Sequence, residues 1–378
     1  MAGLQSEVNP SKTAGRARTI WRLVFVNVGV FVLCFVAIEG LLSGLLLAWD
    51  VARERVIAER HHTEYDPELG WVNIASVHLP DMYGPGVFLT TNRQRFRGRR
   101  DFAQEAPPTK RRVICSGDSV TFGYGVDDDH TWCSILESLD SRLETVNMGQ
   151  GGYGADQAYL WYKRDGGSLR HHVQLFAPIT ENFRRMERET FLGYGKPRLV
   201  LEGGRLSVTN VPVPMRSYLL PWVTESIEHL GSLRATAAMR RIHRRLAGPP
   251  SDSGSEVQAE NREQTAGVVY KVLEELKHLN AQRSSQLVLI YLPTLYDHPA
   301  ALEFWSAVLA QHASTLEIPF VNLVEAFERL PDDEAERLYL PDRGHFNSRG
   351  NEYVARLIHR ELANNATVKK ILFAAERR

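Results

Sequence analysis

The chain has 378 residues, of which 43% are hydrophobic and 24% charged, the composition of ordinary globular material. Its 45 basic residues balance 45 acidic ones, which argues against a nucleic-acid-binding surface. The three cysteines, Cys34, Cys115 and Cys133, show neither a disulfide framework nor a metal-ligand spacing, and we expect Cys115 and Cys133 to be buried free thiols rather than a bridge.

The first segment of the chain is typical of a membrane anchor. Residues 1–20 are polar and basic and predict a disordered cytoplasmic tail. From Leu23 to Trp49 the chain is apolar, and a helix needs about 20 residues to cross a bilayer. A cleaved signal peptide would have a shorter apolar core, of about 7–15 residues, followed by a small-residue cleavage site. We therefore predict one transmembrane helix at 21–49.

Residues 50–110 predict a lead-in segment that packs on the core. Leu69-Gly70-Trp71 and several glycine turns punctuate short strand-like pieces. We interpret this segment as a cover over the sheet rather than as part of a substrate site.

The core, from 111 to 378, alternates strands with helices. The apolar run at 112–117 is typical of a buried strand, and Trp132, Ile135, Leu136 and Leu139 recur at helical spacing. This order predicts parallel strands joined by right-handed crossovers, hence a three-layer α/β/α sandwich. Further strands are expected at 145–148, 172–179, 286–292 and 318–323, and helices at 131–143, 155–163, 264–282, 301–314 and after His345.

An insertion at about 184–262 interrupts this alternation. Two strand-like runs about Gly203-Gly204 predict a hairpin at 198–210. A helical, arginine-rich piece up to Arg245 follows, and then a flexible linker at 248–255. The insertion could form one wall of an active-site cleft or be a surface elaboration, and the sequence does not separate the two.

Two polar motifs suggest a nucleophile and its base. Gly117-Asp118-Ser119 directly follows the first core strand, at the carboxyl edge where α/β folds bind ligands. Asp342 and His345 lie three residues apart in a loop before the last helix. His345 could take the proton of Ser119, and Asp342 could hold the imidazole in the required tautomer.

Together these motifs resemble the SGNH/GDSL hydrolase superfamily, from about Asp66 to the end of the chain. Residues 147–152, Asn-Met-Gly-Gln-Gly-Gly, resemble its second block, with Gly152 at the glycine. The third block departs from the usual Gly-x-Asn-Asp, because this chain has Thr180-Glu181-Asn182-Phe183. The resemblance implies a flavodoxin-like parallel sheet, and an oxyanion hole made by the Ser119 and Gly152 backbone N–H groups and the Asn182 side chain. A one-residue shift would place Glu181 there instead.

The resemblance implies a membrane-anchored serine esterase that cleaves an O-acyl ester of a carbohydrate, a lipid or a small molecule. No cofactor or metal is expected. One alternative is an O-acyltransferase acting on an envelope polysaccharide, which would need a polytopic acyl-transfer partner; another is a non-catalytic binding protein on the same fold. Four basic residues precede the span and three follow it, a weak positive-inside signal. With the single-anchor envelope relatives of this superfamily, it favours a periplasmic catalytic domain.

Overall fold

The computed structural model describes residues 10–52, 61–219 and 253–373. Contacts divide the chain into two units. The first comprises Met1–Arg55 and Glu225–Ser251, and the second comprises Val56–Thr224 and Asp252–Arg378.

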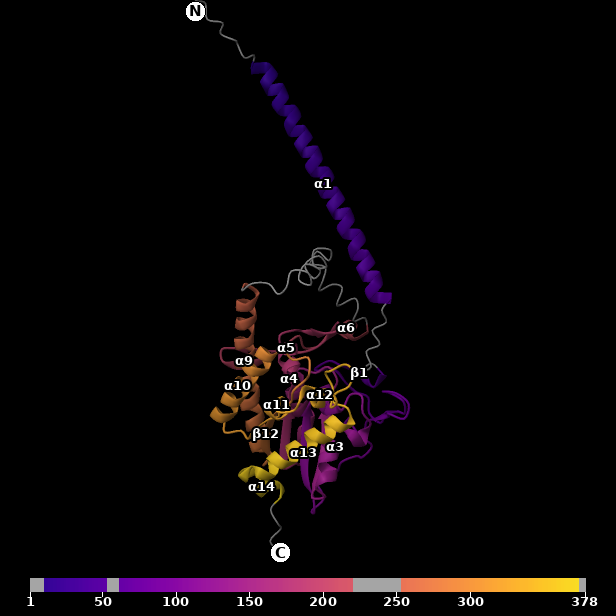
Figure 1. The fold of residues 1–378 in the computed structure, drawn as a ribbon, viewed down its shortest axis with the longest axis vertical. Coiled ribbons are helices and arrows are strands. Elements are labelled where there is room, and N and C mark those ends of the chain that lie inside the picture. The colour runs from indigo at the N-terminus through magenta and orange to yellow at the C-terminus, as the bar shows by residue number, and fades with distance from the viewer. Residues whose placement is uncertain (1–9, 53–60, 220–252, 374–378) are drawn as a thin grey trace, which may run out of the picture. The chain divides into compact units, whose positions relative to one another are not determined.

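In the first unit, one long helix is described, α1 (Pro10–Ala52; Figure 1). Its stretch Trp21–Leu45 has a mean hydropathy of 2.3 and is not buried, so it is long and apolar enough to cross a membrane. Length and composition alone also fit a signal sequence. The prediction of a disordered tail at 1–20 was wrong for residues 10–20, which continue the helix; residues 1–9 lie outside the described residues.

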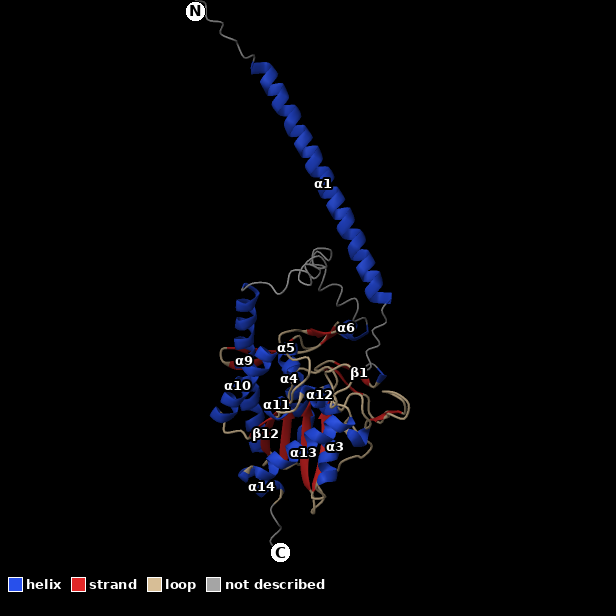
Figure 2. Cartoon of the chain, viewed as in Figure 1, coloured by secondary structure: helices blue, strands red, loops and turns tan. Residues whose placement is uncertain are grey.

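The second unit is built on a five-stranded parallel sheet with the order β13-β12-β7-β5-β6 (Figure 2). The first core strand, β5, therefore lies between the second and the third, which is the flavodoxin-like order. The next two strands in the chain, β6 and β7, lie on opposite sides of β5, so the strand order reverses there. Ligands of α/β folds bind at such switch points. The strands are β5 (Arg111–Gly117), β6 (Leu143–Gly149), β7 (Val173–Ala177), β12 (Gln286–Tyr291) and β13 (Phe320–Asn322).

Helices cover both faces of this sheet. Because successive strand residues point to opposite faces, Ile114 of β5 packs in one core cluster, while Val113 and Cys115 pack in the other. The first cluster includes α4 (Ala155–Asp165), α9 (Ser253–Gln282) and α10 (Pro299–Thr315); the second includes α3 (Trp132–Leu139), α13 (Ser348–Asn364) and α14 (Ala366–Leu372). The predicted three-layer sandwich is confirmed.

Shorter helices complete the core. They are α2 (Ser119–Phe122), α5 (Thr180–Met186), α11 (Val324–Glu328) and α12 (Asp332–Glu336), with 3₁₀ turns at Asp128–His130 and Gly166–Ser168. The helix predicted at 131–143 ends earlier, at Leu139. Asp140 accepts hydrogen bonds from the backbone and side chain of Arg142, which forms a turn, and Leu143 begins β6.

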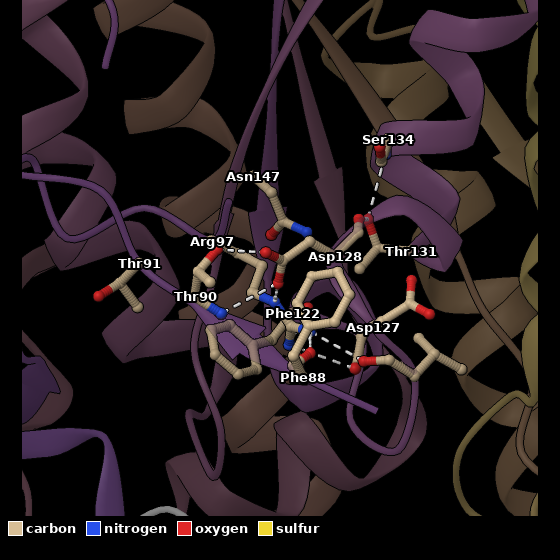
Figure 3. A network of polar contacts seen from close by, with 12 residues as sticks. Phe88, Thr90, Thr91, Arg97, Phe122, Asp127, Asp128, Thr131, Ser134 and Asn147 are labelled. Carbon is tan, nitrogen blue, oxygen red and sulfur yellow. Dashed lines mark hydrogen bonds and ion pairs between the residues drawn. The ribbon is translucent and has the colours of Figure 1, made fainter. Parts of the chain in front are cut away.

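The lead-in segment forms two antiparallel ribbons packed on the core. They pair β1 (Thr63–Asp66) with β2 (Gly70–Asn73) and β3 (His78–Leu79) with β4 (Leu89–Thr90). Figure 3 shows how this segment is held: the guanidinium of buried Arg97 donates to Asp128 at 2.6 Å, and the Thr90 backbone N–H donates to the same carboxylate at 3.1 Å. Arg97 also lies over the ring of Phe122, with 4.8 Å between its guanidinium carbon and the ring centroid. The lead-in therefore braces the short helix that follows β5.

The insertion is described in part. It contains β8 (Thr190–Phe191), β9 (Tyr194–Gly195), β10 (Arg198–Glu202), β11 (Arg205–Thr209) and α6 (Met215–Leu219). β10 and β11 pair about Gly203-Gly204, so the predicted hairpin is confirmed. Of the predicted arginine-rich helical piece, residues 220–245 lie outside the described residues. Of the predicted linker, residues 253–255 begin α9, and the rest also lies outside the described residues.

One cysteine prediction was wrong. Cys115 of β5 and Cys133 of α3 form a disulfide, and both are completely buried. The strand and the helix pack face to face in the second core cluster, which brings these two side chains together. The remaining cysteine, Cys34, is free in α1.

Candidate active site

Ser119 occupies the first position of α2, directly after the central strand β5. The preceding Asp118 caps this helix, because its carboxylate accepts the Val120 backbone N–H at 2.9 Å. The helix ends after one turn at Gly123, whose φ of 86° is left-handed. Ser119 is therefore presented at the carboxyl edge of the sheet on a short, tightly fixed turn.

His345 reaches Ser119 from the other end of the chain. Its Nε2 lies 2.9 Å from the Ser119 Oγ, and its Nδ1 lies 2.5 Å from an Asp342 carboxylate oxygen. The same carboxylate accepts the backbone N–H groups of Gly344 at 3.0 Å and His345 at 3.2 Å. The three-residue spacing thus forms a turn that folds the acid back onto its own histidine, as the loop position predicts.

The electrostatics of this loop keep its acid ionised. Partial burial raises the pKa of Asp342, but the hydrogen bond and charge of His345 and the two backbone N–H groups outweigh that effect and lower the pKa below its usual value. An ionised Asp342 is the form that can accept the Nδ1–H of His345 and leave Nε2 free to take a proton.

Aromatic rings support the histidine. The ring of Tyr124 lies against His345 with 4.4 Å between centroids, and Tyr83 packs against Tyr124 at 4.8 Å. A Cβ added at the neighbouring Gly344 would lie 2.4 Å from the ring of Tyr296, so this ring packs against the backbone of the loop. The imidazole of His345 is only about one-fifth exposed, at 21%.

Gly152 lies in the loop between β6 and α4. It has a φ of 77°, and a Cβ there would lie 2.7 Å from the ring of Phe191 and 3.2 Å from Trp71, so neither the backbone nor the space tolerates a side chain. Trp71 also donates its indole N–H to the carbonyl of Gly151 at 2.9 Å. In the described part of the chain, the backbone N–H groups of Ser119 and Gly152 donate to no other backbone or side-chain acceptor.

Asn182 is the third residue of α5 and is buried. Its side-chain oxygen accepts the Ile179 backbone N–H at 2.8 Å. Its amide nitrogen donates to Asp118 at 2.8 Å and to the Tyr153 carbonyl at 3.0 Å. Glu181, the shifted alternative, instead pairs with Arg184 at 2.9 Å. Asn182 is therefore the third-block residue that contacts the nucleophile turn, while its role as an oxyanion donor stays a prediction.

Two site-facing residues were missed from the sequence. Trp71 was interpreted as packing, although it also fixes the glycine loop. Arg185 was not considered, although it lies one helical turn after Asn182 and donates to Asp118 at 3.2 Å. Its spacing of three from Asn182 on a helix was the available signal. Across the described ranges, no cluster of three or more histidine, cysteine or acidic side chains could hold a metal ion.

Comparison with known proteins found no matching family model and no matching curated protein. Solved structures do match. A lipase/acylhydrolase from Enterococcus faecalis is 13% identical with a TM-score of 0.40, covering 67% of this chain and 96% of its own. A member of the lipolytic protein G-D-S-L family from Veillonella parvula is 15% identical with a TM-score of 0.36, covering 68% and 98%. The esterase EstA from Pseudoalteromonas sp. is 10% identical with a TM-score of 0.37, covering 68% and 98%. At this level of identity the similarity concerns the fold alone.

Proposed function

We propose that this chain is a membrane-anchored serine hydrolase of the SGNH/GDSL type that cleaves an O-acyl ester. The observation that carries the proposal is the continuous hydrogen-bonded relay from Asp342 through His345 to Ser119, whose members come from opposite ends of the core. In an Asp-x-x-His turn that serves only as a surface turn, nothing requires the second ring nitrogen of the histidine to contact a buried serine.

The relay supports a two-step acyl transfer. The Ser119 Oγ attacks the ester carbonyl carbon while His345 Nε2 takes the hydroxyl proton. The tetrahedral intermediate collapses, the bond to the leaving oxygen breaks, and His345 returns the proton to the departing alcohol. A water molecule then attacks the acyl-enzyme, with His345 again accepting the proton, and the carboxylic acid leaves as Ser119 regains its hydrogen.

The negative charge of each intermediate falls on the carbonyl oxygen, which needs donors fixed in advance. The Ser119 N–H belongs to the nucleophile turn and the Gly152 N–H to the loop after β6, and neither donates to another backbone acceptor in the described residues. We assign them to the oxyanion hole, with the Asn182 side chain as the third donor.

We further propose that the catalytic domain lies outside the cytoplasm, held by a membrane-spanning segment of α1. The weak charge bias around the apolar stretch supports this orientation. So does the buried Cys115–Cys133 disulfide, because disulfides persist in oxidising compartments such as the periplasm.

The test uses the full chain in membranes or detergent. A fluorophosphonate probe should label the wild type on Ser119, and Ser119→Ala should be unlabelled. Ser138→Ala, which alters an exposed serine bonded only to its own helix, is the matched control and should label like the wild type. A panel of acetyl, acyl-lipid and small esters then identifies the substrate class. A wild type that neither reacts with the probe nor hydrolyses any ester would overturn the proposal and favour a binding role.

A further inference from the structure

Arg185 and Asn182 share their hydrogen-bond acceptors. The amide nitrogen of Asn182 donates to an Asp118 oxygen at 2.8 Å and to the Tyr153 carbonyl at 3.0 Å. The Nη1 of Arg185 donates to the same Asp118 oxygen at 3.2 Å and the same carbonyl at 2.9 Å. Two side chains one helical turn apart on α5 thus serve the same two acceptors.

The guanidinium of Arg185 lies in the wall of the site. Its side chain is only 10% exposed, and its carbon lies 4.6 Å from the centroid of the Phe191 ring. Phe191 is the ring that fills the space beside Gly152. Within the described residues, the buried Nε of Arg185 has no hydrogen-bond partner. The position of this guanidinium therefore leaves one of its own donors unsatisfied.

The amide of Asn182 has two N–H bonds, and both are in use. Donating to an oxyanion therefore means releasing Asp118 or the Tyr153 carbonyl. A buried acceptor left without a donor costs about 1–3 kcal/mol, which would cancel much of the gain. Arg185 already donates to both acceptors, so that neither is abandoned.

We propose that Arg185 is a positioning residue for the oxyanion hole: it retains Asp118 and the Tyr153 carbonyl while Asn182 turns one N–H toward the developing oxyanion. This inference rests on the proposed serine hydrolase function and deepens it. The step exchanges hydrogen bonds only: no covalent bond is broken and no proton is transferred. Arg185 acts through Asn182 and need not touch the substrate.

A simpler role would be to neutralise buried Asp118, and the two roles predict different kinetics. If Arg185 only neutralises Asp118, it supports the fold in every background. Removing Arg185 should then lower the reaction rate by the same factor with and without Asn182. A positioning residue matters only while Asn182 is present to be released. The experiment is therefore a double-mutant cycle on Asn182 and Arg185.

The readout is the rate of fluorophosphonate labelling of the full chain. The phosphoryl oxygen of the tetrahedral phosphorus occupies the oxyanion hole, and no natural substrate is required. Arg185→Met should lower the maximal labelling rate by about 10–10²-fold, with little change in probe affinity. This loss is smaller than the roughly 10²–10³-fold expected when an oxyanion donor is removed outright. Arg185→Lys should restore most of the rate, because an ammonium has three donors for the two acceptors. In the Asn182→Ala background, Arg185→Met should lower the rate by no more than about twofold.

Arg184→Met is the matched control, because Arg184 neighbours Arg185 but is exposed and pairs with Glu181. It should label like the wild type. Melting temperatures identify any variant that fails to fold; if Arg185→Met does so, Arg185→Gln, neutral and too short to reach both acceptors, replaces it in the cycle.

Equal fold-losses from Arg185→Met with and without Asn182 would overturn the inference and leave a charge partner for Asp118. So would a wild-type labelling rate in a folded Arg185→Met. In both cases the wild type is labelled and the proposed function stands. An unlabelled wild type is the separate result that removes the proposed function, and this inference with it.

Discussion

Trp71 donates its indole N–H to the carbonyl oxygen of Gly151 across 2.9 Å, although the two residues are 80 positions apart. Its own carbonyl accepts the hydroxyl of Tyr153 at 2.6 Å. The loop that carries Gly152 is thus bonded on both sides to one residue of the lead-in segment. This segment does more than cover the sheet, because it fixes the backbone of a proposed oxyanion donor.

Removing that indole hydrogen bond should therefore affect catalysis before stability. Trp71→Phe keeps most of the buried ring but leaves the Gly151 carbonyl without its indole donor. We expect kcat to fall by about 10-fold, or about 1.4 kcal/mol, with KM little changed. Steady-state kinetics on the best ester of the panel measure this. A rise in KM at constant kcat would instead place Trp71 in substrate binding.

The acid of the relay should be needed in its ionised form. Asp342→Asn keeps the shape of the side chain but reverses its hydrogen bond to His345, so kcat should fall by up to about 10⁴-fold. Because the pKa of Asp342 is lowered, this carboxyl stays ionised at every pH above its usual range. The acid limb of the wild-type kcat/KM profile should therefore contain no ionisation of Asp342. An ionisation on that limb that is lost in Asp342→Asn would contradict this assignment.

Buried His171 should make the fold acid-sensitive. Burial lowers its pKa to about 4, only partly offset by its hydrogen bond to the Leu169 carbonyl. Between the usual pKa of about 6.5 and that value, the unfolded chain binds more protons than the folded one, so stability falls as pH falls. The loss should reach about 2 kcal/mol at pH 5 relative to pH 7.

The measurement is urea unfolding of wild type and His171→Gln at both pH values. Glutamine can still bond the hydroxyl of Tyr162, which lies 2.8 Å from the imidazole, but it does not titrate. The variant should lose less stability on acidification, by about the amount above. The same acid loss in both proteins would assign it to other groups.

The disulfide gives a test of both chemistry and location. If Cys115 and Cys133 are bridged in the cell, only Cys34 should react with a thiol reagent in denatured, unreduced protein. Closing a loop of 18 residues should contribute about 3 kcal/mol, so Cys115→Ala/Cys133→Ala should fold but unfold at lower urea. In spheroplasts, a C-terminal tag should be cleaved by added protease. Three reactive thiols and a protected tag would place the domain in the cytoplasm.

Local patterns predicted most of the core because they depend on periodicity alone. The alternation of strands and helices, the hairpin at Gly203-Gly204 and the turn at Ser119 follow from residues that are neighbours in sequence. The relay was predictable in its members, since Asp342 and His345 lie in one loop. The structure adds the distance of 2.9 Å between Ser119 and His345, which no local pattern contains.

What the sequence did not predict depends on side chains meeting across elements. The pairing of Cys115 with Cys133 requires α3 to lie on the same face of the sheet as alternate residues of β5. The part played by Arg185 requires α5 to face Asp118 and the Tyr153 carbonyl at once. The continuation of α1 back to Pro10 was missed because basic and polar residues were taken as a tail rather than as a helix end.

The separation of nucleophile and base along the chain sets an order of events during synthesis. Ser119 emerges with the second core element, whereas Asp342 and His345 arrive just before the last two helices. Their loop leads into α13, which packs on α3, and the Trp132 backbone N–H donates to Asn351 of α13 at 3.0 Å. Domains form from the N-terminal end as the chain is made. Because Asp342 and His345 belong to this late segment, the proposed relay to Ser119 can form only after the loop before α13 has been made and has docked.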